Sequence, residues 1–405
     1  MSEHTLVSME NPSEKHGNYR SMELVSYILF GIGPLVGNAV LTLLGPISID
    51  FLVDPTVILI ALPSFMFPFS FFQLFSGALS DIYGRVSIIV GGLVAFLIGL
   101  GLISFSPSIE LFAFGHLIAG IGFGFVNPVL LALLSDSALP QEIPKRMGIA
   151  SALASFGVGL GPFLAGQMAI LGWQIYYLIM LCIVFLGLIG ILVANRPPVV
   201  VHGEPGIPAL IKNLSIELRK RVVLLMLVTT FLIPLVYLGT FVWTSRGLTG
   251  FIDEGLIGLL LLGGGAFGTI AGFSLGWFIR TKGFGITTTT GIIPLIAALV
   301  LFLIIGDITQ PSSIPQVGIA IMFVGWAGGI LFPLMITYSQ VISPERRGVL
   351  AGVVTFSFFL GVALIPTIYV PLFDLGMSSL YLGILGVSLL LLVFIFLLYR
   401  RIDQL

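Results

Sequence analysis

Charged residues are scarce in this chain. Asp, Glu, Lys and Arg make up 9% of its 405 residues, whereas 57% are hydrophobic. A soluble domain carries about 25% charged residues. The shortage, together with a mean hydropathy of +1.15, excludes an ordinary soluble domain and predicts a polytopic membrane protein. The net charge of −1 and the spread of basic residues over loops also exclude a nucleic-acid-binding surface.

Cysteine and the common catalytic motifs are also missing. The single Cys182 excludes a disulfide framework and a Cys-based metal site. The glycine-rich segment 261–272 lacks the following Lys and Ser or Thr of a phosphate-binding loop, so ATP drive is not expected. The chain contains no HExxH motif and no plausible catalytic triad. We therefore expect no cofactor, no metal and no enzymatic activity.

Long apolar runs recur along the whole chain. A helix needs about 20 mostly apolar residues to cross the hydrocarbon core of a bilayer. Runs of this length, without the alternation of a β-barrel, predict an all-α integral membrane fold with twelve transmembrane helices. The expected spans are 23–47, 56–79, 86–105, 110–135, 147–170, 174–195, 222–246, 255–278, 284–306, 314–340, 348–372 and 377–399.

The basic residues sort to one side of these spans. All of the 17 Lys and Arg residues except Arg246 fall on the same face of a twelve-span arrangement. Because Lys and Arg in short loops mark the cytoplasmic side, both termini are expected in the cytoplasm and the protein in the plasma membrane. Residues 1–21 are predicted to be a flexible N-terminal tail, and 400–405 a C-terminal tail.

The two halves of the chain resemble each other at an offset of 200 residues. Pro34 returns as Pro234, and Gly161 returns as Gly361. This repeat predicts two six-helix halves, 22–195 and 222–399, which is a known plan of transporters. Residues 196–221 are the expected cytoplasmic linker, in which 208–218 form either a short interfacial helix or a solvated connector.

A charged motif separates spans two and three. Gly77, Asp81, Gly84 and Arg85 fit the pattern GxxxDxxGR, and with them the chain resembles twelve-span transporters of the major facilitator superfamily. The resemblance implies that this loop latches the cytoplasmic helix ends, with Asp136 at the end of span four as its partner. We expect an Asp81, Arg85 and Asp136 network that favours the outward-facing state. The alternative is that Arg85 only sets the topology.

Span five carries a glycine pattern of the drug:H⁺ antiporter branch of that family, Gx8Gx3GPx2GG. The matching positions are Gly148, Gly157, Gly161, Pro162, Ala165 and Gly166, with Ala165 as the only departure. Span eight supplies an apparent counterpart in Gly264, Gly268, Gly272 and Gly276. Since the family fold packs span five against span eight, these residues are expected to form the interface between the halves. The alternative is generic glycine-rich membrane packing.

His116 is the notable ionisable residue within a span, because no Asp, Glu or Lys lies at a span centre. It stands where the family's antiporters commonly carry an arginine linked to proton coupling. Histidine has an unperturbed pKa of about 6.5 and can exchange a proton at physiological pH. His116 therefore either couples protons or contacts substrate, or it is a neutral buried histidine bonded to a neighbouring group.

Spans one, four, seven and ten line the cavity in the family fold. In each of these spans, helical spacing indicates which residues share one face. The faces predicted to line the cavity are mainly apolar and aromatic, with scattered neutral hydrogen-bonding groups. The nominated residues are Asn38, Thr42, Phe123, Asn127, Tyr237, Thr240, Trp243, Thr244, Trp326 and Thr337. Such a lining suits lipophilic or weakly polar small molecules.

These observations predict a secondary transporter that exports small organic molecules by alternating access, with protons as the exchanged ion. The expected partners are a small-molecule substrate, protons and the lipid bilayer, and the expected assembly is a monomer. Two alternatives stay open. One is a nutrient importer or facilitator of the same fold, and the other is a membrane sensor or scaffold that transports nothing.

Overall fold

The structure is a computed structural model that describes residues 19–139, 141–195, 207–306, 308, 310–343 and 346–402. Most of the expected N-terminal tail, the first part of the expected linker and the last three residues of the expected C-terminal tail lie outside the described residues. The second part of the expected linker contains a helix, which occupies almost the residues 208–218 considered for it.

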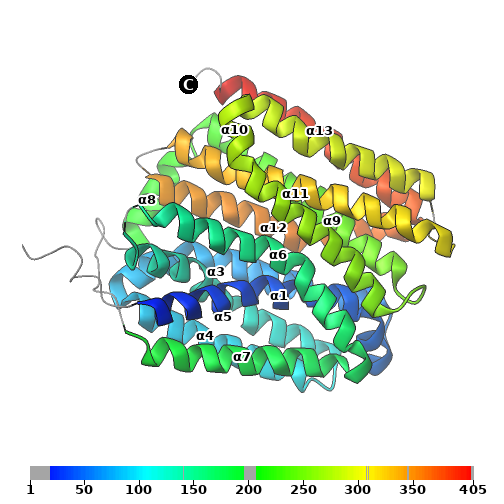
Figure 1. The fold of residues 1–405 in the computed structure, drawn as a ribbon, viewed down its shortest axis with the longest axis horizontal. Coiled ribbons are helices and arrows are strands. Elements are labelled where there is room, and N and C mark those ends of the chain that lie inside the picture. Colours follow the sequence, from blue (N-terminus) through cyan, green and yellow to red (C-terminus); the bar gives the residue numbers. More distant parts are fainter. Residues whose placement is uncertain are drawn as a thin grey trace, which may run out of the picture.

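The described residues are almost entirely helical (Figure 1). Two single turns of 3₁₀ helix lie at Ala169–Leu171 and Pro311–Ser313. The α-helices are α1 (Arg20–Phe51), α2 (Pro55–Ile58), α3 (Ala61–Tyr83), α4 (Arg85–Ser104), α5 (Ile109–Asp136), α6 (Ile143–Met168), α7 (Trp173–Val193), α8 (Ile207–Glu217), α9 (Arg221–Leu248), α10 (Glu254–Ile305), α11 (Ile314–Ile342), α12 (Arg347–Phe373) and α13 (Met377–Ile402).

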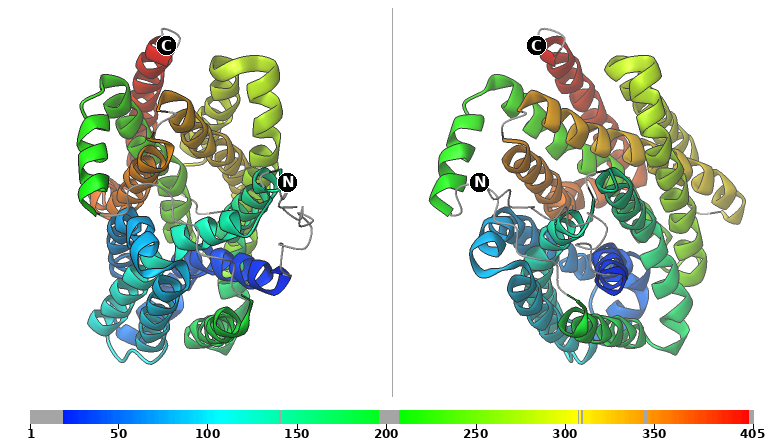
Figure 2. Two further views of the ribbon diagram at one scale, coloured as in Figure 1. Left: turned by 90° about the vertical axis from the view of Figure 1, so that its left-hand side faces the viewer. Right: turned by 60° about the vertical axis from the view of Figure 1, so that its left-hand side comes forward.

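Helix α10 contains two of the expected spans. Its 52 residues would extend about 78 Å as one straight helix, more than twice the thickness of a hydrocarbon core. Gly283 interrupts it with a φ of 70°, a conformation that glycine adopts without steric cost, and the chain turns back there (Figure 2). The described chain has eleven helices long and apolar enough to cross a membrane, and α10 crosses twice. The predicted all-α, twelve-span fold is confirmed.

The helices form two groups that repeat one contact. In Figure 2 the first half, α1 to α7, lies below the second half, α9 to α13. Gly161 of α6 lies against the backbone of Leu35 in α1, and Gly361 of α12 lies against Phe231 and Pro234 in α9. The same close approach thus occurs in both halves at the offset of 200 residues found in the sequence.

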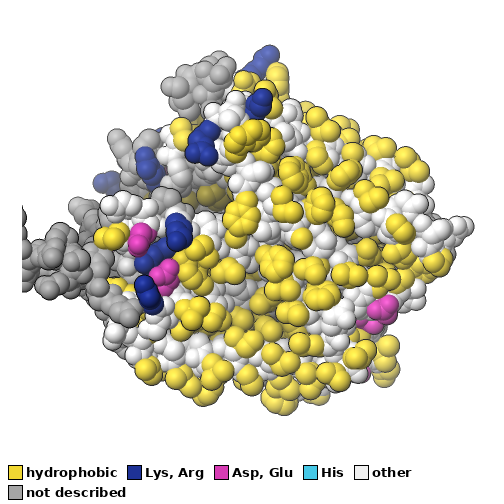
Figure 3. All heavy atoms as spheres, in the orientation of Figure 1, with side chains coloured by type: hydrophobic (Ala, Val, Ile, Leu, Met, Phe, Trp, Pro, Cys, Tyr) yellow, Lys and Arg dark blue, Asp and Glu magenta, His cyan; other side chains and the backbone are white. Residues whose placement is uncertain are grey.

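The surface has an apolar belt and two different ends (Figure 3). The start of α1, helix α8 and the C-terminus lie at the same end of the bundle (Figure 1). We call this the basic end, because Lys and Arg side chains gather there in Figure 3. Arg85 begins α4, Arg346 precedes α12 and Arg400 lies in the last turn of α13. The other end, called the opposite end, carries the only basic residue that the sequence places on the far face, Arg246.

The halves pack against each other through α6 with α10 and through α3 with α12. The first contact is a meeting of backbones. A Cβ atom added to Gly159 would lie 2.7 Å from the carbonyl oxygen of Leu261 and 2.9 Å from the Cα of Gly265. A Cβ on Gly258 would lie 2.8 Å from the Cα of Phe163. Only glycine allows two helices to approach this closely.

This contact corrects the expected role of the span-eight glycines. Gly264, Gly268 and Gly272 face α11 of their own half, where Gly268 lies against the carbonyl of Gly325, and Gly276 has no neighbour. The interface with α6 is made by Gly255, Gly258 and Gly265 instead. The four span-eight glycines do lie on one face of α10. Successive residues of a helix point about 100° apart, so the spacing of four defines a face but does not determine which neighbouring helix that face contacts.

The span-five pattern also divides between two neighbours. Gly157 and Gly161 face α1 of the same half, whereas Gly166 lies against the backbone of Glu254 in α10. Ala165 is buried and Gly148 has no close neighbour. The glycine of α6 in closest contact with Gly265 is Gly159, which lies outside the pattern.

We predict that Gly159→Val weakens the contact between the halves. The added side chain would collide with the backbone of α10, and overpacking of this kind costs about 1–3 kcal/mol. Thermal unfolding of the purified protein in detergent should show a clearly lower midpoint. Gly276→Val on α10 is the control, because nothing lies within 4 Å of its Cβ position. Equal midpoints for the two variants would contradict the assigned interface.

Candidate functional site

Phenylalanine rings from the two halves meet along α3, α5 and α12. The ring centroid of Phe69 lies 5.5 Å from that of Phe123 and 4.7 Å from that of Phe359 in the other half. Phe359 lies 5.3 Å from Phe358, which stacks at 3.9 Å on Phe332 of α11. We call these rings, together with Phe65, the aromatic bridge.

Glycines make room for the bridge. The Phe123 ring occupies the space that a side chain at Gly33 of α1 would need, and Gly120 of α5 lies against the backbone of Phe65. Phe123 is the bridge residue that the sequence nominates. Phe65, Phe69, Phe358 and Phe359 lie on α3 and α12, which are not among the spans expected to line a cavity, and Phe332 lies on α11, an expected lining span, at a position that was not nominated. The bridge has no charged group, so it is suited to planar apolar molecules that can stack between rings.

Three of the other nominated cavity residues use their polar atoms in contacts between helices. The Thr42 hydroxyl donates to the carbonyl of Pro162 in α6 at 2.8 Å. The hydroxyl of Thr244 is hydrogen-bonded to that of Tyr381 at 2.8 Å. The Trp326 indole donates to the carbonyl of Thr290 at 3.0 Å. These groups hold helices together and do not converge with the bridge.

The remaining nominated residues divide between local bonds and packing. Asn38, Thr240 and Thr337 donate to carbonyls of their own helices. Tyr237 packs over Gly328, and the buried Trp243 ring lies 4.8 Å from that of Phe373. Asn127 is half-buried and lies one helical turn after Phe123 of the bridge. Phe123 is the nominated residue whose ring contacts the other rings of the bridge.

His116 lies inside the first half. Its side chain is buried, and its Nδ1 lies 2.9 Å from the carbonyl oxygen of Phe112. The Phe112 and Tyr177 rings surround it at centroid distances of 4.4 and 5.8 Å. Its Nε2 has no partner among the described residues. The backbone contact is the one expected of a neutral buried histidine, and a role in proton exchange stays a prediction.

Arg85 lies between the two acidic residues expected beside it. Its Nη1 lies 2.5 Å from Oδ1 of Asp81, and its Nε lies 3.1 Å from Oδ2 of Asp136 at the end of α5. Nη1 also donates to the Ser80 hydroxyl. The φ of 88° at Gly84 allows the tight turn between α3 and α4 that places Arg85 there. The structure brings the three groups together, and their action as a latch stays a prediction.

A second ionic cluster at the basic end joins α8 to the start of α12. Oε1 of Glu217 accepts from the Ser343 hydroxyl at 2.9 Å and from Nη1 of Arg346 at 3.0 Å, and Lys220 lies 2.9 Å from Oε2. Burial favours protonation of Glu217, but the bonds from Lys220, Arg346 and Ser343 outweigh it and lower the pKa of the carboxyl. The sequence indicated a helix or a connector here and gave no sign that Glu217 would be buried.

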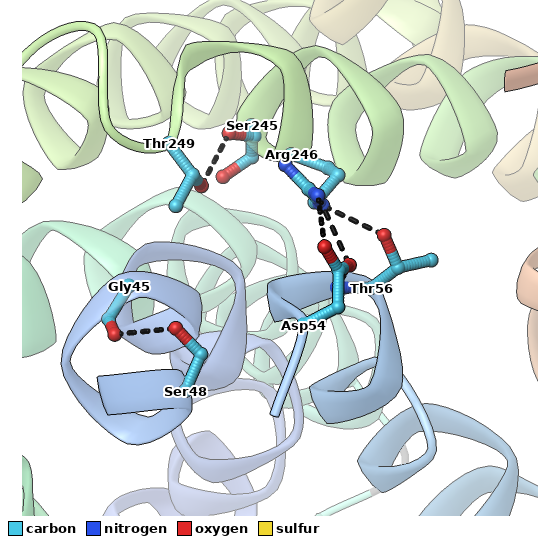
Figure 4. Close-up of polar contacts among 7 residues, drawn as sticks. All are labelled: Gly45, Ser48, Asp54, Thr56, Ser245, Arg246 and Thr249. Carbon is cyan, nitrogen blue, oxygen red and sulfur yellow. Dashed lines mark hydrogen bonds and ion pairs between the residues drawn. The ribbon is translucent and has the colours of Figure 1, made fainter. Parts of the chain in front are cut away.

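At the opposite end, an ion pair joins the two halves (Figure 4). Nη2 of Arg246 in α9 lies 3.1 and 3.4 Å from the two carboxylate oxygens of Asp54, and its Nε donates to Oγ1 of Thr56 at 2.9 Å. The guanidinium also lies 5.2 Å from the centre of the Phe373 ring. We call Asp54, Thr56 and Arg246 the clasp. The sequence singled out Arg246 but named no partner for it.

Two further hydrogen bonds join the halves near the clasp. The Ser245 hydroxyl donates to the carbonyl of Leu41 in α1, and the Gln167 amide at the end of α6 donates to the carbonyl of Gly255 at 3.0 Å. The halves are thus tied at the opposite end by one ion pair and by bonds from α6 and α9. These bonds hold the two halves together at this end.

The Asp54 carboxylate of the clasp stays ionised over the physiological pH range. The hydrogen bond from the Thr56 hydroxyl has the largest effect on the pKa of Asp54 and lowers it. Burial raises this pKa, but the backbone hydrogen bond from Thr56 and the Arg246 guanidinium lower it further, so the net shift is downward. A lowered pKa keeps the carboxylate ionised above its ordinary pKa of about 4. The contribution of the pair is therefore fully present above that value and is lost only as the pH falls through the lowered pKa.

We predict that Arg246→Ala opens the opposite end in a larger share of molecules. A partly exposed ion pair contributes up to about 1 kcal/mol, so the open population should rise by about two- to fivefold. Spin labels on cysteines at the exposed positions Leu52 and Leu375, in a Cys182→Ser background, would report the distance across this end.

Arg280→Ala is the matched control, since Arg280 bonds to the carbonyl of Gly276 in its own helix. The wild-type distance distribution should not change between about pH 5 and pH 8, because the lowered pKa of Asp54 lies below that range. An unchanged distribution in Arg246→Ala, or a marked opening of the wild type at pH 5, would contradict the role of the clasp.

Comparison with known proteins agrees with this architecture. The Major Facilitator Superfamily profile matches residues 24–366. Among solved structures, the nucleoside transporter NupG has a TM-score of 0.74 at 12% identity, covering 94% of this chain and 99% of NupG. The xylose transporter XylE of E. coli, in a partially occluded inward-open conformation, also has a TM-score of 0.74, at 11% identity, covering 95% of this chain and 98% of XylE.

The similar sequences include resistance proteins. The quinolone resistance protein NorA of Staphylococcus aureus (strain COL) is 24% identical over 329 residues, which cover 78% of this chain and 80% of NorA. The methylenomycin A resistance protein of Bacillus subtilis (strain 168) is 36% identical over 117 residues, only 28% of this chain and 25% of that protein. The profile match over most of the length, with twelve spans in two repeated halves, shows that this multi-pass membrane protein belongs to the Major Facilitator Superfamily.

Proposed function

We propose that this chain exports small, lipophilic or weakly polar organic molecules by alternating access, in exchange for protons. The observation that carries the proposal is the aromatic bridge, an uncharged set of rings contributed by both halves. Rings held between two halves that move apart can take up a planar apolar molecule on one side and release it on the other. The printed names of two relatives, resistance to quinolones and to methylenomycin A, favour export.

The two ends of the molecule supply the gates. With the basic end in the cytoplasm of a plasma-membrane protein, as the distribution of Lys and Arg favours, the closed clasp faces outward. The structure then corresponds to a state that is shut toward the outside. Both termini lie in the cytoplasm in this arrangement, and one chain holds both halves of the site, so we propose that it works as a monomer.

The cluster of Asp81, Arg85 and Asp136, the proposed latch, acts at the basic end. Arg85 contacts Asp81 and Asp136 while the opposite end is closed, so these pairs brace the ends of α3, α4 and α5 within the first half. We propose that this braced surface is the one that the second half meets when the basic end closes.

We predict that Arg85→Ala reduces the transport rate several-fold and lowers the population closed at the basic end. Arg85→Lys should restore only part of it, because lysine keeps the charge but cannot contact two carboxylates through separate nitrogens. Efflux from vesicles measures the rate, and Arg219→Ala, a basic residue at the same end outside this cluster, is the control. An Arg85→Ala protein with wild-type rate and conformational balance would exclude the latch.

The proposed proton exchange has one suggested carrier. His116 is a histidine inside a span, and its Nε2 has no partner among the described residues, so it has a free position for a proton. The cost of charging it among Phe112 and Tyr177 would have to be met by a change of surroundings during the cycle. The role of His116 is therefore tested by measuring proton movement during transport and not by substrate binding alone.

We predict coupled proton release from liposomes. With protein reconstituted under an inward-acid pH gradient, adding lipophilic cations or neutral aromatic compounds should cause proton efflux that His116→Gln lacks. His202→Gln, a change in the expected linker, is the control. Substrate flux without proton movement would contradict antiport and favour facilitated diffusion. Proton efflux that His116→Gln retains would assign the coupling elsewhere.

Import is the competing direction. The similar solved structures include a nucleoside and a xylose transporter, but at 11–12% identity this likeness concerns the fold alone. An importer of polar nutrients would need charged or strongly polar groups at the site, whereas the aromatic bridge consists of phenylalanine. Uptake of nucleosides or xylose by the reconstituted protein, without export of aromatic compounds, would reverse the proposal.

A further inference from the structure

One polar side chain stands unpaired beside the aromatic bridge. Gln73 of α3 is 7% exposed, and its amide nitrogen Nε2 has no hydrogen-bond partner among the described residues. A buried donor without a partner costs the folded protein the desolvation of that group, so such groups are rare unless they have a use. Its backbone carbonyl is satisfied, since the Ser76 hydroxyl donates to it at 3.1 Å.

Gln73 lies where the two halves touch. Phe69, one turn earlier on α3, contacts Phe359 of α12, and Leu74, the next residue, lines a small apolar groove with Gly352 of α12. Each residue of a helix is rotated by about 100° about the helix axis from the one before it. Gln73, four residues after Phe69, is therefore rotated by about 40° from Phe69, toward the side of Leu74. Helical side chains lean toward the N-terminus of their helix, so the amide extends toward the level of Phe69.

A second amide lies at the same level on α5. Gly124 lies close to the backbone of Gln73, its Cβ position being 3.4 Å from the Gln73 nitrogen, and Asn127 follows three residues later. Asn127 is half-buried, and no hydrogen bond of its amide occurs among the described residues. Gln73 lies one turn after Phe69 and Asn127 one turn after Phe123, and these two rings lie 5.5 Å apart, which places both amides about one helical turn from the bridge.

We propose that Gln73, with Asn127 beside it, determines substrate specificity by donating a hydrogen bond to a neutral acceptor on a planar aromatic substrate. The flat rings of the substrate stack on the bridge, and its carbonyl oxygen or ring nitrogen takes the place of the missing partner of Nε2. A site built to hydrogen-bond one group discriminates against a molecule that lacks it, because the buried donor is then left unpaired. This inference rests on the proposed function and narrows its substrate class.

The test compares 9-fluorenone with fluorene, which share a planar three-ring skeleton and differ in the carbonyl group. Radiolabelled probes would be bound to the full-length protein in lipid nanodiscs, and their efflux measured in proteoliposomes. The wild type should bind fluorenone about five- to tenfold more tightly than fluorene, as expected for one hydrogen bond in a buried site. Gln73→Leu should abolish this preference by weakening fluorenone binding alone.

Two variants separate recognition from folding. Gln73→Met keeps the length of the side chain but has no donor, and it too should lose the preference for fluorenone. Gln340→Leu is the control, since the Gln340 amide donates to the neighbouring Ser339 hydroxyl at the end of α11, and it should keep the preference. Without probe, Gln73→Leu should unfold at the wild-type temperature or above it, because it removes an unpaired buried donor.

The outcomes distinguish this inference from the proposed function. Equal affinity of the wild type for both probes, with both exported, would overturn the role of Gln73 and leave export standing. A preference retained by Gln73→Leu, or a strong loss of thermal stability in that variant, would also overturn it, the latter by showing that the amide has a structural partner. If the protein neither bound nor exported either probe, the proposed aromatic substrate class would fail, and this inference with it.

Discussion

The meeting of the α6 and α10 backbones at Gly159 and Gly265 is the contact on which the arrangement of the two halves depends. Apolar helices gain little from the hydrophobic effect inside a bilayer, so their association relies on close van der Waals packing and interhelical hydrogen bonds. The glycines allow the backbones of α6 and α10 to pack closely, and they have no side chains that would interlock the two helices. This contact holds the halves together, and in the proposed cycle one half tilts against the other about it.

Charge and aromatic surface are separated along the axis of the molecule. The ionic clusters lie at the two ends, with Arg85 and Glu217 at the basic end and Arg246 at the opposite end. The middle of the interface between the halves is occupied by the rings around Phe69 and Phe359. Ion pairs are expensive in the centre of a membrane and can be broken and remade at its surfaces. The ends are thus suited to gating, and the centre to apolar recognition.

The sequence predicts the fold well because membrane thickness fixes the length of every span. It predicts two spans within α10, 255–278 and 284–306, and Gly283, where the chain turns back, lies between them. It also places Asp81 and Arg85 four residues apart, on one side of a helix end, where the structure joins them. Local spacing and composition carry this information.

Contacts between distant segments are what the sequence could not predict. Thr42 bonds to Pro162, and Phe69 meets Phe359, through helix rotations that no local pattern encodes. A glycine stripe was assigned to the wrong neighbour because a rotation of one residue separates the face toward α6 from the face toward α11. Arg246 stood out as a lone basic residue, but its partner Asp54 lies in the other half.

The central claim is that the two ends open alternately about the α6 and α10 contact. The direct test is a pair of distance measurements in nanodiscs, in a Cys182→Ser background. One pair of spin labels spans the opposite end, at Leu52 and Leu375, and the other spans the basic end, at the exposed Tyr83 and Val341. On addition of an exported aromatic compound, one distance should lengthen as the other shortens. Distances that change together, or an end that opens while the other stays open, would contradict the account.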